Sequence, residues 1–205
     1  ILMKILKGFF LILILSSTLI VYQVYDSSWY MALLLNDFNV SKYYDRPIAQ
    51  IEQIPDKFPN ISLTTIPLKA AKSNYYIKQR KFEEAKNLLY ESMNDNPFLG
   101  INESNLSEIF YLEKLYDSAV YYAEIAVNKL PNNPRHIINL QRGYTALKED
   151  KKLDSIYNLY KYKENITYHF FQNHFLFLTN AINEYSKHHK NEIKYSVKRF
   201  LQNKM

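Results

Sequence analysis

The strongest constraint on the fold of this chain is an internal repeat, because residues of the same kind recur 34 positions apart. The pairs that match between the first and second copies are Ser73 and Ser107, Tyr76 and Phe110, Phe82 and Tyr116, Ala85 and Ala119, and Pro97 and Pro131. The pairs that match between the second and third copies are Leu106 and Leu140, and Phe110 and Tyr144. The next matches are 37 apart, Tyr116 with Leu153, Ala119 with Ile156 and Ala123 with Tyr160. We therefore expect a three-residue insertion that loops out within the polar residues 148–152.

Each copy has the pattern of two short helices joined by a tight turn. The expected helices are residues 68–79 and 82–94, then 104–114 and 116–130, then 134–147 and 153 to about 163. Pro97 and Pro131 end the first two copies, since proline cannot continue a helix. We expect the small residues Ala85 and Ala119 where the two helices cross closely, because a larger side chain there would cost about 1–3 kcal/mol.

The spacing and these residues resemble the tetratricopeptide repeat family over residues 66–164. The positions that carry the resemblance are the aromatic residues Tyr76, Phe110 and Tyr144, the helix-opening Phe82 and Tyr116, the small Ala85, Ala119 and Ala126, and the closing Pro97 and Pro131. The early tryptophan and glycine of the family pattern are missing. The resemblance implies an all-α fold, an α-α superhelix or solenoid of stacked helix pairs. The alternative is a plain helical bundle with a chance repeat.

The resemblance also implies a binding groove, because the first helix of each repeat lines a concave face that receives a peptide or a partner helix. Carried over by register, the groove positions are Asn74, Lys78, Glu108, Tyr111, Arg135 and Arg142. Lys78, Arg135 and Arg142 could clamp an acidic or carboxylate-bearing ligand. The alternative is a solvated face that binds nothing.

The N-terminus carries 18 consecutive uncharged residues, 8–25, between Lys7 and Asp26. As a helix they span about 27 Å, which is enough to cross the hydrocarbon core of a bilayer. We favour an uncleaved transmembrane helix over a cleaved signal, because bulky residues 19–25 follow the small Ser16 and Ser17. A buried helix of a soluble protein is the third alternative.

Charges beside this segment predict its orientation. Lys4 and Lys7 precede it, and the next basic residue after it is Lys42, so the N-terminus is expected in the cytoplasm and the rest outside. The chain begins Ile1, Leu2, Met3, so either translation starts near Met3 or the chain is a piece of a longer protein.

Four segments follow from these patterns: residues 1–25 as the anchor or signal, 26–65 as a degenerate capping repeat and connector, 66–164 as three helix pairs, and 165–205 as C-terminal capping helices. In the capping repeat we expect a first helix from Trp29 to Asp37, continuous with the span, and a second one within Tyr43 to Pro55. Pro55, Pro59 and Pro67 then indicate an extended connector.

Composition excludes several function classes. Three glycines leave no room for a glycine-rich phosphate loop, and the absence of cysteine excludes disulfides and thiolate chemistry. The net charge of +6 is spread along the chain, which argues against nucleic-acid binding. The histidines and carboxylates lack the spacing of a metal site or a catalytic motif. We expect neither an enzyme nor a cofactor or metal site.

These patterns together predict a scaffold or adaptor protein, anchored by a single pass in a bacterial inner membrane, whose periplasmic repeats bind a protein or peptide. An alternative comes from a second resemblance, over residues 61–134, to the repeat tail of bacterial O-antigen ligase or polymerase-like proteins. That resemblance is carried by Asn94 to Gly100, Tyr116 to Ala119 and Leu130 to Pro134. It implies a tail or subunit of machinery that assembles cell-surface glycans.

Overall fold

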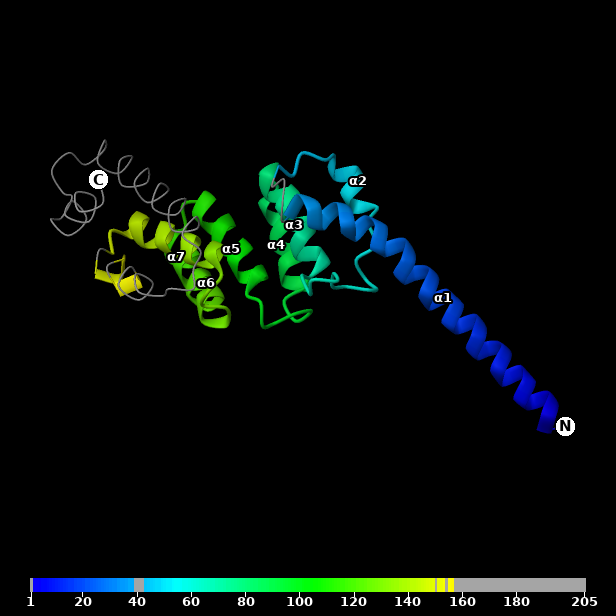
Figure 1. The fold of residues 1–205 in the computed structure, drawn as a ribbon. Helices are drawn as coiled ribbons and strands as arrows, with labels where there is room; N and C mark the ends of the chain where they lie inside the picture. Colours follow the sequence, from blue (N-terminus) through cyan, green and yellow to red (C-terminus); the bar gives the residue numbers. More distant parts are fainter. Residues whose placement is uncertain (1, 39–42, 150, 154, 157–205) are drawn as a thin grey trace. The chain divides into compact units, whose positions relative to one another are not determined.

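The computed structural model describes residues 2–38, 43–149, 151–153 and 155–156, and this part of the chain is all-α with antiparallel packing of neighbouring helices (Figure 1). The helices are α1 (Leu2–Asn36), α2 (Ile48–Glu52), α3 (Leu68–Lys78), α4 (Phe82–Glu91), α5 (Ile101–Leu112), α6 (Tyr116–Lys129) and α7 (Pro134–Leu147). The chain divides within α5 into an N-terminal part, residues 1–105, and a C-terminal part, residues 106–205.

Helix α1 is uninterrupted over 35 residues, because it contains no proline and its single glycine, Gly8, lies near its start. Its side chains from Met3 to Asp26 are exposed, and the helix is long and apolar enough to cross a membrane. Ser17 and Thr18 donate their hydroxyl groups to the carbonyls of Leu13 and Ile14, at 2.8 and 2.9 Å. These polar groups are thus satisfied within the helix, as a lipid environment requires.

The C-terminal end of α1 packs against the repeat region. Ser27, Met31 and Leu34 are buried at helical spacing, and α1 contacts α3. The expected helix from Trp29 to Asp37 is therefore confirmed as a continuation of the apolar segment, apart from its last residue, which lies just beyond α1.

Helix α3 is the centre of the N-terminal part, where α1, α2 and α4 all contact it. Every residue from Ala70 to Ile77 is buried, so its polar side chains need partners inside the protein. The Lys72 ammonium donates to the carbonyl of Ile54 and forms a 2.8 Å ion pair with Asp56. The connector thus supplies the partners of a buried charge.

The second helix expected within residues 43–55 is much shorter than that range, since α2 covers only five residues. Pro47 is its N-cap, and Tyr44 before it has a left-handed backbone with φ of 51°. Residues 53–67 contain no helix; they form turns and bends, and Ile61 pairs with Pro67 in an isolated antiparallel bridge. Helix α5 begins three residues before the expected position, directly after Gly100, whose φ is 65°.

In the C-terminal part, α6 and α7 form an antiparallel pair around a core of Val120, Ala123, Leu140 and Tyr144. Helix α7 has the predicted bounds. Its first turn is set locally, because Pro134 occupies the first helical position and the side chain of Asn133 accepts a hydrogen bond from the amide of Arg135.

The turn after the first helix of each repeat has the same backbone structure in all three copies. Arg80, Lys114 and Lys148, spaced 34 apart, have φ values of 59°, 64° and 61°. The amide after each of them donates a 2.9 Å hydrogen bond to the carbonyl of the repeated aromatic residue, namely Tyr76, Phe110 and Tyr144. Each left-handed residue also bonds to the carbonyl three residues back, which completes a Schellman motif. The 34-residue period is therefore confirmed in the backbone.

The expected three-residue insertion after the third turn is wrong. The amide of Leu153 bonds to the carbonyl of Glu149 at 3.1 Å, as that of Ala119 bonds to the carbonyl of Leu115 34 positions earlier. Residues 151–153 are helical, so charged side chains open a helix where we expected a loop. Charge alone does not distinguish the two, because the first turn of a helix is usually exposed. Residues 155–156 are helical as well, whereas residues 157–163 of the expected helix and the expected capping helices of residues 165–205 lie outside the described residues.

Candidate functional site

Four of the six predicted groove residues come together in the C-terminal part, on α5 and α7. We call Glu108, Tyr111, Arg135 and Arg142 the α5–α7 face. The guanidinium of Arg135 lies 2.9 Å from Oε2 of Glu108 in an ion pair whose side chains are 30% and 28% exposed, respectively. Such a pair orients both side chains but contributes only about 0–1 kcal/mol to stability.

The second contact in the α5–α7 face joins Arg142 to Tyr111. The guanidinium carbon of Arg142 lies 5.6 Å from the centroid of the Tyr111 ring, within range of a cation–π interaction. The ring of Tyr116 lies beside Tyr111, with centroids 5.6 Å apart and planes tilted by 54°. The sequence predicted Tyr116 only as the residue that opens the second helix of its repeat, and its contact with Tyr111 was not predicted.

These contacts hold two partly exposed guanidinium groups in defined positions next to aromatic surface. A planar guanidinium can donate two parallel hydrogen bonds to a carboxylate, and its stem and neighbouring ring can contact apolar groups. The α5–α7 face is therefore suited to an acidic segment that also carries apolar side chains.

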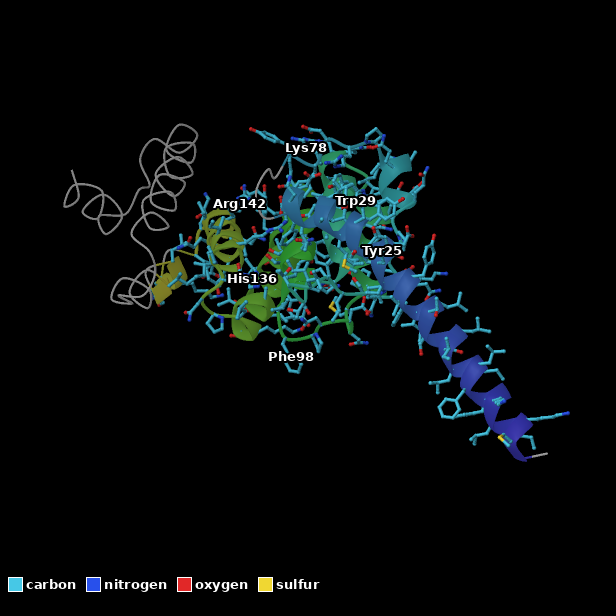
Figure 2. The ribbon with its side chains drawn as sticks, turned by 45° about the vertical axis from the view of Figure 1, so that its right-hand side comes forward. Tyr25, Trp29, Lys78, Phe98, His136 and Arg142 are labelled. Atoms are coloured by element: carbon cyan, nitrogen blue, oxygen red, sulfur yellow. The ribbon has the colours of Figure 1, made fainter. Side chains whose placement is uncertain are left out.

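Asn74 and Lys78 belong to the N-terminal part, and they differ in exposure. Asn74 is only 3% exposed, and its amide donates to the carbonyls of Ala70 and Ala71 in its own helix. The side chain of Asn74 is therefore too buried to make the contact with a partner that we predicted for it. Lys78 is exposed at the last residue of α3 (Figure 2).

Buried asparagines at the start of α5 are a feature that the sequence analysis missed. The amide nitrogen of Asn105 donates to the carbonyl of Ala70 and the hydroxyl of Ser73, both at 3.0 Å. That of Asn102 donates to the carbonyl of Leu89 at 2.7 Å. The run of polar residues 102–105 resembles a solvated surface in sequence, so only the tertiary contacts reveal its burial.

A second missed group fastens α1 to the repeats. Oδ2 of Asp37 accepts hydrogen bonds from the Tyr75 hydroxyl at 2.6 Å and from Nε of Arg46 at 2.8 Å. Burial, followed by the bond to Asp37, raises the pKa of Tyr75, and the same carboxylate raises the pKa of Arg46. Tyr75 therefore stays a neutral donor and Arg46 a cation, which suits both to a buried carboxylate.

Two of the repeated aromatic residues have the same chemistry. The hydroxyl of Tyr76 donates to Glu52 at 3.0 Å, and that of Tyr144 donates to Glu124 at 2.6 Å. Burial raises the pKa of Tyr76 to about 12 and also raises that of Tyr144. Phe110, which has no hydroxyl, instead stacks on Tyr122 with centroids 5.3 Å apart. The large side chains fill the predicted positions, and the two tyrosines also bind a neighbouring carboxylate.

The fold and its contacts define an all-α protein of repeated helix pairs, with one N-terminal helix that could cross a membrane or serve as a signal sequence. No protein-family model matches the chain, and neither a curated protein nor a solved structure matches it. Within the described ranges, no three His, Cys, Asp or Glu side chains gather as a metal ion would require.

Proposed function

We propose that this protein is a membrane-anchored scaffold of tetratricopeptide repeats, which binds a protein partner through the α5–α7 face on the outer side of a bacterial inner membrane. Helix α1 is the anchor, with its N-terminus in the cytoplasm. The protein acts by binding and carries out no catalysis of its own.

The observation that carries this proposal is the recurrence of one Schellman turn at Arg80, Lys114 and Lys148, each between two antiparallel helices or helical segments. A period of 34 residues with a turn at a constant position is the hallmark of tetratricopeptide repeats. Proteins of this type use the first helix of each pair for recognition. Glu108, Tyr111, Arg135 and Arg142 all lie on such first helices.

The chemistry of the α5–α7 face favours an acidic peptide segment as the partner. A partner carboxylate that reaches Arg135 competes with Glu108 for the same guanidinium. The guanidinium of Arg142, beside the Tyr111 ring, offers a second cationic contact to the same segment.

Site-specific photocrosslinking in native membranes tests this proposal. Benzoylphenylalanine placed at Tyr111 should yield a discrete crosslinked product, whereas the same probe at Tyr121, an exposed tyrosine on α6, should not. Adding Arg142→Glu should abolish the product at Tyr111 through charge repulsion. The same product from both tyrosines, or a product that survives Arg142→Glu, would contradict the proposed face.

The identity of the crosslinked protein separates the proposal from its alternative. A soluble or exported protein with an acidic segment supports the scaffold. A multispanning membrane protein of glycan assembly would instead support the reading of this chain as a subunit of that machinery.

A further inference from the structure

The four most exposed large hydrophobic side chains in the described residues all belong to the N-terminal part. They are Leu63, Phe98, Tyr25 and Trp29, with exposed fractions of 86%, 79%, 75% and 74%. Side chains of this kind scattered singly need no explanation, but two pairs of them on one part of a protein can mark an interaction surface.

Tyr25 and Trp29 lie one helical turn apart on α1, where the uncharged segment ends. They belong to the face of the helix opposite to the buried Ser27 and Met31. Tyrosine and tryptophan at this place on a membrane helix typically mark the level of the lipid headgroups.

Leu63 and Phe98 lie on two loops that are fastened to each other. The side chain of Asn96 donates to the carbonyl of Thr65, and that of Asn60 donates to Asp95, both at 2.8 Å. The amide of Leu68, the first residue of α3, bonds to the carbonyl of Asn60 at 2.9 Å. The two loops therefore form one end of the N-terminal part, beyond the start of α3.

This end lies on the side toward which α1 runs into the membrane. In Figure 2, Phe98 lies at the lower end of the N-terminal part and Lys78 at its upper end, and the N-terminal half of α1 runs obliquely downward and to the right. The bond between Asp37 and Tyr75 sets the level of α3 along α1. Leu68, at the start of α3, lies seven residues before Tyr75, which is about 10 Å of helix. The loops that carry Leu63 and Phe98 thus lie at the end of α3 opposite to Lys78.

We propose that the N-terminal part rests on the lipid bilayer, with Leu63 and Phe98 inserted into the same interface as Tyr25 and Trp29. This inference rests on the proposed role of α1 as a membrane anchor. The anchor keeps both loops at a high effective concentration near the lipid, so that two apolar side chains are enough for lasting contact. Insertion would fix the tilt of the N-terminal part above the membrane.

Spin labelling of the full chain in phosphatidylethanolamine and phosphatidylglycerol vesicles tests the inference. The sequence has no cysteine, so single variants carry one label each. The test sites are Leu63→Cys and Phe98→Cys. Tyr25→Cys reports the interface, Ile12→Cys the bilayer core and Lys78→Cys the aqueous end. The measurement is the accessibility of each label to oxygen relative to a water-soluble nickel chelate.

We expect this ratio at residues 63 and 98 to be several-fold higher than at residue 78 and close to that at residue 25. If residue 12 is in the bilayer core while 63 and 98 resemble 78, the resting contact is wrong and the anchor stands. If residue 12 is also aqueous, both the anchor and the contact are wrong.

A label-free measurement removes the apolar label as a cause of insertion. In a Trp29→Phe background, Phe98→Trp should fluoresce with a blue-shifted maximum and be quenched by brominated lipid. The matched control is Lys78→Trp in the same background. Emission from residue 98 as red and as unquenched as that from residue 78 would overturn the inference.

Discussion

The hydroxyl of Tyr75 donates a 2.6 Å hydrogen bond to Oδ2 of Asp37, which joins the C-terminal end of α1 to α3, the central helix of the N-terminal part. The same carboxylate binds Arg46, and the Tyr44 ring packs edge-on against Tyr75 with centroids 5.3 Å apart. These contacts hold the end of α1 against α3.

Tyr75→Phe should lower the free energy of unfolding of the repeat region by about 1–3 kcal/mol, because it removes a hydrogen bond and leaves the buried carboxylate of Asp37 with one donor fewer. Urea unfolding in detergent, followed by circular dichroism, measures the effect. Tyr121→Phe is the matched control, since Tyr121 is exposed. Equal stability of the two variants would show that the bond to Asp37 contributes nothing.

Gly143→Ala should destabilise the C-terminal part, although alanine is normally favoured in a helix by about 1 kcal/mol. A Cβ at residue 143 would lie 2.5 Å from Cγ2 of Val120, where α6 and α7 approach each other. We expect a net loss of about 1–3 kcal/mol from this overpacking. In a Val120→Ala background the same substitution should be neutral or stabilising. A loss that persists in that background would contradict the proposed clash.

Lys114→Gly should raise thermal stability, by about 0.5–1 kcal/mol, because glycine adopts the left-handed backbone of the Schellman turn without the steric cost of a Cβ. The control is Asn87→Gly, at an exposed position inside α4, which should lower stability because glycine is a poor helix former. Thermal melting distinguishes the two variants. If both lower the melting temperature, the left-handed turn at Lys114 is not part of the folded protein.

Stability should fall as the pH rises from about 10 to about 12, because the unfolded chain gives up the Tyr76 proton in this window while the folded protein keeps it. Below pH 10.0 both states hold the proton and the contribution is fully present. The full loss in the free energy of unfolding is about 3 kcal/mol. Urea unfolding at about pH 9 and about pH 11.5 measures it, and Tyr76→Phe should show a smaller fall. The same fall in both proteins would exclude Tyr76 as its source.

Ile5→Cys and Lys78→Cys test the orientation of α1 in bacterial cells. With the N-terminus in the cytoplasm, a membrane-impermeant maleimide should label residue 78 in cells with a permeabilised outer membrane, and residue 5 only after lysis. The mass of the mature protein, measured in parallel, should include residues 8–25. A shorter product released from the membrane would identify α1 as a cleaved signal.

Helix boundaries were predictable where the local chemistry sets them. Helix α7 begins at Pro134 and α3 begins at Leu68, both as predicted. The start of α5 was not predictable, because Gly100 adopts a left-handed conformation only in the context of its turn. The short length of α2 was also not predicted. Residues 43–46 contain neither glycine nor proline, so their sequence does not show that the helix begins only after Pro47.

The residue types of the α5–α7 face were predictable from the repeat register, but their pairing was not. Arg135 follows Glu108 by 27 residues and Arg142 follows Tyr111 by 31, neither of which is the repeat period. Long side chains choose partners by reach and direction, which depend on how α7 lies against α5. The burial of Asn74 was not predicted for a related reason, since an asparagine on a first helix has the same sequence pattern whether it faces solvent or protein.

The amino-acid sequence by itself determined the helical periodicity, the 34-residue recurrence and the apolar N-terminal segment, because each depends on contacts between near neighbours along the chain. The tertiary structure decided which charges meet. The ion pair of Glu108 with Arg135 and the shared carboxylate of Asp37 join residues brought together only by helix packing. Such contacts are specified by distance and direction in space, and a linear pattern carries neither.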